Sequence, residues 1–113
     1  MDRLVNYRNI VKDLLQSQAE YMENSAQPVI ETQLSFDELR DNYLLLNVGW
    51  TKQGRMLVPA IYMRLHNGKI WVENDWTEAG IVDALIDRGV PTDDIVLGFH
   101  PPEMRSYTEF AVS

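Results

Sequence analysis

The dipeptide Asn67–Gly68 restricts the fold of this chain more than any other feature, because it separates two apolar segments, 56–65 and 70–72. Asn and Gly both tolerate a positive φ, which a type I′ turn requires at its two central positions. Such a dipeptide between two apolar runs is the strongest short-range hairpin signal in a sequence. The sequence therefore predicts an antiparallel β-hairpin that turns at Asn67–Gly68.

Two further segments extend this hairpin into an antiparallel meander. Residues 43–50 form an apolar run that a short polar loop, 51–55, connects to the segment 56–65. Residues 29–34 alternate between polar and apolar side chains and are expected to form a strand of their own. Pro59 lies inside the segment 56–65 and cannot donate a backbone hydrogen bond, so we expect a bulge or an edge position there.

Strict alternation along these strands predicts a sheet that is apolar on both faces. One face would carry Tyr43, Leu45, Asn47, Met56, Val58, Ala60 and Tyr62, and the other Leu44, Leu46, Val48, Leu57, Ile61, Met63 and Leu65. Such a sheet must be covered twice, by a helix on each side or by another subunit.

Helical periodicity appears before the first strand. Between Leu4 and Met22 the apolar residues fall on one side of a 3.6-residue wheel, which predicts a long amphipathic helix. Gln18 lies inside the apolar stripe of this helix. We interpret it as an amide at the edge of the core, or as a register-setting polar group if the stripe packs against a second copy.

A second helix is predicted nearer the C-terminus. Asp75 and Glu78 resemble a capping box at its start, residues 81–86 supply its apolar side, and Gly89 and Pro91 end it.

The remaining residues complete the predicted fold. The apolar run 95–99 is typical of a mostly buried strand, Pro101–Pro102 should form a stiff exit from it, and residues 108–112 are compatible with a terminal strand. This order predicts an α+β fold: an antiparallel β-meander of four to five strands, with a long N-terminal helix and a second helix near the C-terminus. At 113 residues the chain should be a single domain, 1–113.

Composition suggests the compartment. The N-terminus lacks the apolar core of a signal peptide and no apolar run approaches the roughly 18 residues of a membrane span, so we expect a cytoplasmic protein that does not enter a membrane. The chain has no cysteine, which excludes disulfides, thiolate catalysis and cysteine-based zinc sites.

Several motifs spread over nearly the whole chain form a specific set. They are the segments 43–50, 67–72, 77–78, 80–81, 89–91, 95–99, 101–103 and 105–112. Together they resemble the XisI family, the fdxN-element excision controlling factors. The chain departs from the family pattern at Asn47, where an Asp is common, and at Thr92 and Ser106, where a Lys is common. These departures put charge-dependent contacts at the three positions in doubt.

The resemblance implies a function in programmed excision of a DNA element from a nitrogen-fixation gene during heterocyst differentiation in cyanobacteria. It implies an accessory factor, whereas a separate recombinase cuts and joins the strands. Family members are usually paired with a companion, the XisH-like protein, which resembles restriction-type nucleases. The resemblance carries over no catalytic residues, and we expect no cofactor or metal.

The sequence offers no strong catalytic motif of its own. Residues 49–55 superficially match a phosphate-binding loop, but Arg55 and Met56 replace the Lys and the Ser or Thr of that motif, and the context predicts a hairpin turn. Asp94, Glu103 and Arg105 loosely resemble the acids and base of a metal-dependent nuclease, although a Pro–Pro break separates the acids. We therefore do not expect an enzyme, and metal-dependent cleavage remains the third alternative.

Charge is distributed unevenly along the chain. The net charge is −7, yet the segment 42–72 contains no Asp or Glu and carries +4, which leaves −11 for the remainder. This split is compatible with solvated turns, with a protein interface, or with direct DNA contact. We expect a protein interface, with homo-oligomer formation, and keep a DNA-binding module as the alternative. The interaction candidates are Trp50, Lys52, Arg55, Tyr62, Arg64, Lys69, Glu103 and Arg105.

Overall fold

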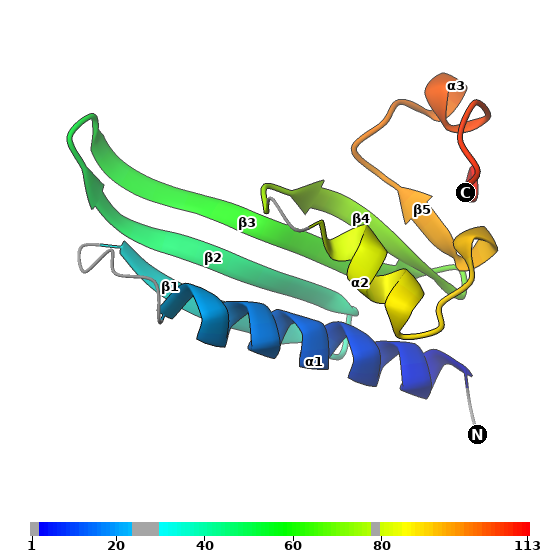
Figure 1. The fold of residues 1–113 in the computed structure, drawn as a ribbon, viewed down its shortest axis with the longest axis horizontal. Helices are drawn as coiled ribbons and strands as arrows, with labels where there is room; N and C mark the ends of the chain where they lie inside the picture. The colour runs from blue at the N-terminus through cyan, green and yellow to red at the C-terminus, as the bar shows by residue number, and fades with distance from the viewer. Residues whose placement is uncertain (1–2, 24–29, 78–79) are drawn as a thin grey trace.

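The computed structural model describes residues 3–23, 30–77 and 80–113. Its elements are α1 (Arg3–Glu23), β1 (Ile30–Asp37), β2 (Asn42–Thr51), β3 (Gly54–His66), β4 (Lys69–Asp75), α2 (Ile81–Asp87), a 3₁₀ turn η1 (Thr92–Asp94), β5 (Ile95–Leu97) and α3 (Pro102–Arg105). The strands form one five-stranded sheet in the order β1-β2-β3-β4-β5 (Figure 1). The predicted α+β fold is confirmed.

Strands β1 to β4 form the expected antiparallel meander. The β3–β4 turn has positive φ at both central residues, 56° at Asn67 and 75° at Gly68, as a type I′ turn requires. Strand β5 instead runs parallel to β4, because the chain passes through α2 before it returns to the sheet. The predicted first strand began at Val29, which lies outside the described residues, and β1 is described from Ile30.

A bulge in β3 corrects the predicted faces of the sheet. Leu45 pairs with Ile61 while Leu46 pairs with Pro59, so Ala60 is an extra residue. The bulge expected at Pro59 is present, and β3 also has no strand partner from β4 at this position, since β4 pairs with β3 only as far as Ile61. Because one extra residue inverts the alternation beyond it, the predicted grouping of Tyr62 with Tyr43 is wrong.

With the bulge included, Ile61 and Met63 pair with Leu45 and Tyr43 and share their face. Tyr62 pairs with Leu44 on the opposite face. The apolar residues of β3 therefore change faces between its first and second halves.

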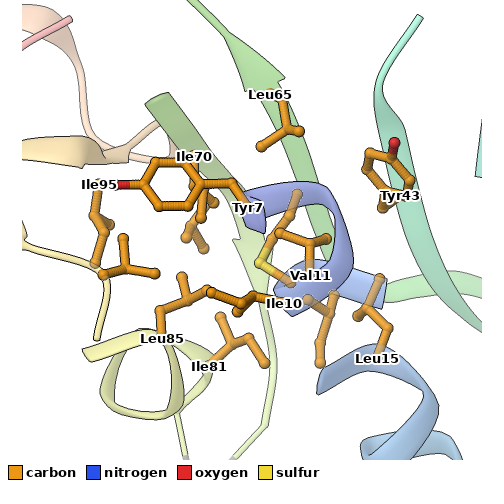
Figure 2. Packing of buried hydrophobic residues seen from close by; sticks show 14 of the residues in the cluster. Tyr7, Ile10, Val11, Leu15, Tyr43, Leu65, Ile70, Ile81, Leu85 and Ile95 are labelled. Carbon is orange, nitrogen blue, oxygen red and sulfur yellow. The ribbon is translucent and has the colours of Figure 1, made fainter. Parts of the chain in front are cut away.

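Both longer helices pack on the same face of the sheet. Val11 and Leu15 of α1 and Leu85 of α2 are fully buried in one cluster with side chains of all four strands from β2 to β5 (Figure 2). From the sheet this cluster takes Tyr43, Leu45, Ala60, Ile61, Met63, Leu65, Ile70, Val72, Ile95 and Leu97. Among the described residues, no helix is both long and apolar enough to cross a membrane.

Polar contacts fix α1 at its N-terminal half. The Tyr7 hydroxyl donates a hydrogen bond of 2.5 Å to Asp94 Oδ2, and burial together with this carboxylate raises the pKa of Tyr7 to about 12. Arg8 binds Asp41 through both carboxylate oxygens, at 2.9 and 3.2 Å, and the Tyr43 hydroxyl donates to the same carboxylate at 2.8 Å. The start of α1 is thereby tied to η1 and to the β1–β2 turn.

Helix α2 begins differently from the prediction. Its N-cap is Gly80 (φ 77°), and the Ile81 N–H donates to Asp75 Oδ2 at 2.7 Å. Asp75 thus accepts a hydrogen bond from the first helical N–H. It lies at the end of β4, six positions before Ile81, and is not the N-cap residue. Glu78, the other half of the expected capping box, lies outside the described residues. Gly89 ends the helix region with φ 92°, as expected.

The C-terminal segment also differs in part from the prediction. Pro101 and Pro102 do not simply end β5: they start the short helix α3, with Pro102 at its first position, where a missing N–H has no cost. Residues 108–112 form no strand, and only an isolated bridge joins Ala111 to Val96.

We predict that the carboxylate of Asp41 stabilises the fold only while it is ionised. The Arg8 hydrogen bonds hold the pKa of Asp41 below its usual value, so this stabilisation is present above pH ~4 and is lost as the pH falls through the lowered pKa. Asp41→Asn keeps a residue type that tolerates the φ of 57°. It should lower the free energy of unfolding at pH 7 by about 1–2 kcal/mol.

Urea denaturation at pH 7 and below pH ~3 checks this, because the difference between wild type and variant should shrink at the lower pH. Asp93→Asn, at an exposed carboxylate, serves as the control. An equal loss at both pH values would contradict the assignment.

Candidate interaction surface

The sheet face opposite α1 and α2 is only partly covered. On this side β2 places Leu44, Leu46, Val48 and Trp50, and β3 places Leu57 and Tyr62; we call these six residues the open face. None of them belongs to the core cluster. Leu57 and Trp50 are each 62% exposed. In the part of the chain that the structure describes, the open face is thus an apolar strip without a covering helix.

The C-terminal segment covers the neighbouring part of the same side. Trp71 of β4 points away from the core cluster, yet it is only 8% exposed. The guanidinium carbons of Arg64 and Arg105 lie 4.9 and 5.1 Å from the centroid of its ring. Arg105 also donates from Nε to His100 O at 3.0 Å and from Nη1 to Val112 O at 3.3 Å. Arg105 therefore fastens the tail over Trp71 and confines the open face to β2 and β3.

A backbone hydrogen bond also holds the tail against β4, from the Gly98 N–H to Val72 O at 2.8 Å. Beside it, Arg64 Nε donates to Glu73 Oε2 at 2.8 Å, which links β3 to β4. Gly98 lies so close to this pair that a Cβ there would be 1.7 Å from Glu73 Oε1. Glycine at position 98 therefore allows the Arg64–Glu73 ion pair to form beside the tail.

The β2–β3 hairpin extends past its neighbours and carries three interaction candidates (Figure 1). Strand β4 pairs with β3 only as far as Ile61, so the outer edge of β3 from Gly54 to Pro59 has no strand partner among the described residues. The Arg55 guanidinium lies 5.4 Å from the Trp50 ring centroid, and its Nη1 donates to Gly49 O at 3.3 Å. Within the described chain, neither Lys52 nor Arg55 has a carboxylate at ion-pair distance.

The eight predicted interaction residues do not form one patch. Trp50, Arg55 and Tyr62 lie on one side of the β2–β3 hairpin, with Lys52 at its tip. The Tyr62 hydroxyl donates to Asn42 Oδ1 at 3.0 Å, so it supports the sheet.

The other four candidates lie toward the opposite end of β3. Arg64 binds Glu73 and lies over Trp71, Arg105 fastens the tail, and Lys69 Nζ donates to Ser113 O at 2.5 Å. Glu103 is exposed on α3 and makes no ion pair within the described residues. The four basic residues of the segment 42–72 are thus split between the two ends of the sheet.

The three residues that loosely resemble a nuclease site, Asp94, Glu103 and Arg105, do not form a site in the structure. Asp94 accepts from Tyr7 and forms an ion pair with Arg3, whereas Glu103 is exposed and Arg105 binds backbone carbonyls. Among the described residues, no group of three or more acidic or histidine side chains is placed to hold a metal ion. The segment 49–55 forms a strand and turn, as expected for a hairpin, and no helix follows it.

Sequence reasoning missed a cleft on the helix-covered side of the sheet. It lies between the C-terminal end of α1, the outer halves of β2 and β3, and the residues after β4, and Asn47 and Trp76 line it. Gln18, predicted as an amide at the core edge, is half-buried and also lines this cleft. No local pattern signals the cleft, because its walls come from four segments distant in sequence.

The chain matches a family model described as XisI protein over residues 1–112. Two crystal structures from Anabaena variabilis are similar to it. One, of a XisI-like protein, has a TM-score of 0.89 and 35% identity and covers 97% of this chain and 99% of its own. The other, of fdxN element excision controlling factor XisI, has a TM-score of 0.84 and 38% identity and covers 99% of this chain and 100% of its own. No curated protein sequence matches the chain.

We predict that Gly98 is required because of Glu73. Gly98→Ala should lower the free energy of unfolding by about 1–3 kcal/mol, since the new methyl group displaces the Glu73 carboxylate from Arg64. In a Glu73→Ala background the same substitution should cost about 1 kcal/mol less. Chemical denaturation of the two single variants and the double variant measures this coupling. Additive effects would show that Gly98 is needed for another reason.

Proposed function

The chain belongs to the XisI family, and on that basis we propose that it acts in controlling the excision of a DNA element. We propose a non-catalytic accessory protein that binds another protein, namely an XisH-like companion or a recombinase. The open face is the observation that supports protein binding, because it exposes aliphatic and aromatic side chains on rigid strands. The exposed Trp50 beside Arg55 adds two residue types that are enriched at interface hot spots.

Electrostatics also favours a protein partner over DNA. The net charge of −7 repels phosphates, and the two basic side chains at the end of the β2–β3 hairpin, Lys52 and Arg55, make a small footprint. An apolar strip flanked by a few cations fits the surface of a protein better than a duplex backbone.

We predict that Leu57→Asp weakens binding of an XisH-like companion by about tenfold or more, because it places a charge in the middle of the open face. Leu39→Asp is the matched control, since Leu39 is 85% exposed in the β1–β2 turn, away from this face. Isothermal titration of the purified companion against wild type and both variants measures the effect. Equal affinity of wild type and Leu57→Asp would contradict the proposal.

Self-association through the open face is a second role that we propose for this surface. The same two variants test it, because Leu57→Asp should shift the mass measured by light scattering toward the monomer whereas Leu39→Asp should leave it unchanged. A monomeric wild type would contradict self-association without affecting companion binding.

A DNA-binding module is the alternative function, favoured by Trp50, Lys52 and Arg55 at the exposed end of the β2–β3 hairpin. We predict no tight binding of duplex DNA even at low salt, because phosphate contacts are few. Fluorescence anisotropy with a labelled duplex over a series of salt concentrations measures this. Tight binding that weakens steeply with salt and is lost in a Lys52→Glu, Arg55→Glu double variant would overturn the protein-binding proposal.

A further inference from the structure

The outer edge of β3 presents backbone hydrogen-bonding groups that no neighbouring strand uses. Along an antiparallel strand, residues whose N–H and C=O face the partner strand alternate with residues that face away. Asn74 Nδ2 of β4 donates to Pro59 O at 2.7 Å, so Pro59 faces away from β2. By the same alternation, the N–H and C=O groups of Leu57 and Arg55 also face away from β2. Strand β4 pairs only as far as Ile61, and no backbone bond of the described turns and loops reaches these four groups.

This edge is more open to pairing than the other free edge of the sheet, which is β1. Strand β1 carries Glu31 and Asp37, and charges on an edge strand disfavour pairing with another chain. On β3 the residues 56–58 are all apolar, and Leu57 and Val58 are 62% and 46% exposed. The free edge ends at Pro59, which has no N–H to donate. It is therefore long enough for one short strand of about five residues.

The cleft described above runs along the same edge, on the helix-covered side of the sheet. Met56 and Val58 line it from β3, and Met22 lines it from α1. Trp76, which follows β4, lines it as well and is 80% exposed. The cleft has a volume of ≈ 790 Å³. Because alternate side chains of a strand point to the same face, every second side chain of a strand added to β3 would lie on the cleft side.

Positive charge lies at the hairpin end of this edge. Arg55 shares the face of Trp50, opposite the cleft, and Lys52 lies in the adjoining turn. Within the described chain neither cation has a carboxylate at ion-pair distance, and the segment 42–72 contains no acidic residue. A carboxylate on an added strand would therefore meet two cations. Pairing of two copies through this edge would instead bring two Arg55 side chains together, so charge favours an acidic segment over a second copy.

We propose that the free edge of β3 binds an extended peptide segment of another protein as an added antiparallel strand. Backbone bonds to Leu57 and Arg55 hold the segment, apolar side chains at alternate positions lie at the cleft, and a carboxylate lies beside Arg55. This mode uses the backbone of β3 and the cleft, whereas the companion was proposed to bind the side chains of the open face. Either proposal can therefore fail without the other.

A capped peptide of the sequence Ser-Val-Ile-Val-Glu is the probe. In an antiparallel register its two valines face the cleft, its isoleucine pairs with Leu57 and its glutamate pairs with Arg55. Titration into the isotope-labelled full-length protein at low salt should shift the amide signals of residues 55–58 and of Trp76. Methylation of the isoleucine backbone nitrogen should weaken binding about tenfold or more, because it removes a donor to β3 and places a methyl group between the strands.

A second pair of probes tests the charge. The peptide that ends in lysine in place of glutamate should bind about three- to fivefold more weakly at low salt. Arg55→Glu should reverse this preference. Arg40→Glu is the matched control, since Arg40 is an exposed cation in the β1–β2 turn, and it should leave the preference unchanged.

Several results would overturn the proposal. They are absence of shifts at residues 55–58, equal affinity of the methylated and unmethylated peptides, and an unchanged charge preference in Arg55→Glu. Amide signals of residues 55–58 that move with protein concentration when no peptide is present would show that a second copy occupies the edge, and would overturn it as well.

Discussion

The sheet is apolar on both faces, but the helices cover only one of them. The other features of the structure follow from this constraint. Helix α1 packs Val11 and Leu15 against β2 and β3, and α2 adds Leu85 on the same side. The chain contains no further long helix among its described residues, so the other side depends on the C-terminal tail. The tail reaches Trp71 but not the open face. Because the strands are apolar on both faces and the helices cover only one face, the other face leaves a surface available for another molecule.

The bulge at Ala60 explains why the faces of β3 were predicted wrongly although its strand and its irregularity were predicted correctly. Asn67–Gly68 fixed the central hairpin, and Pro59 correctly indicated an irregularity in β3. Alternation alone could not show that the irregularity adds one residue, and a single extra residue inverts every face assignment after it. The open face consequently joins Leu57 from one side of the bulge with Tyr62 from the other.

In the C-terminal tail, too, sequence motifs could be recognised, whereas contacts between residues far apart in the sequence could not. Its motifs identified the family, whereas the contacts of Arg105 with Trp71, His100 and Val112 are visible only in the structure. The Arg64–Trp71–Arg105 cluster and the cleft at Asn47 join residues far apart in sequence, so no spacing rule predicts them. The parallel register of β5 was missed for the same reason, because it depends on the path of α2.

We propose that another protein binds at the open face. Methyl NMR of the chain during titration with an XisH-like companion tests it directly, because leucine and valine methyl groups report on both sides of the sheet. If the companion binds at the open face, signals from Leu44, Leu46, Val48 and Leu57 should shift or broaden together, while those of Leu39 and of Val82 on α2 should stay unchanged. Binding of the companion with changes confined to the helices α1 and α2 would show that the open face is not the binding surface.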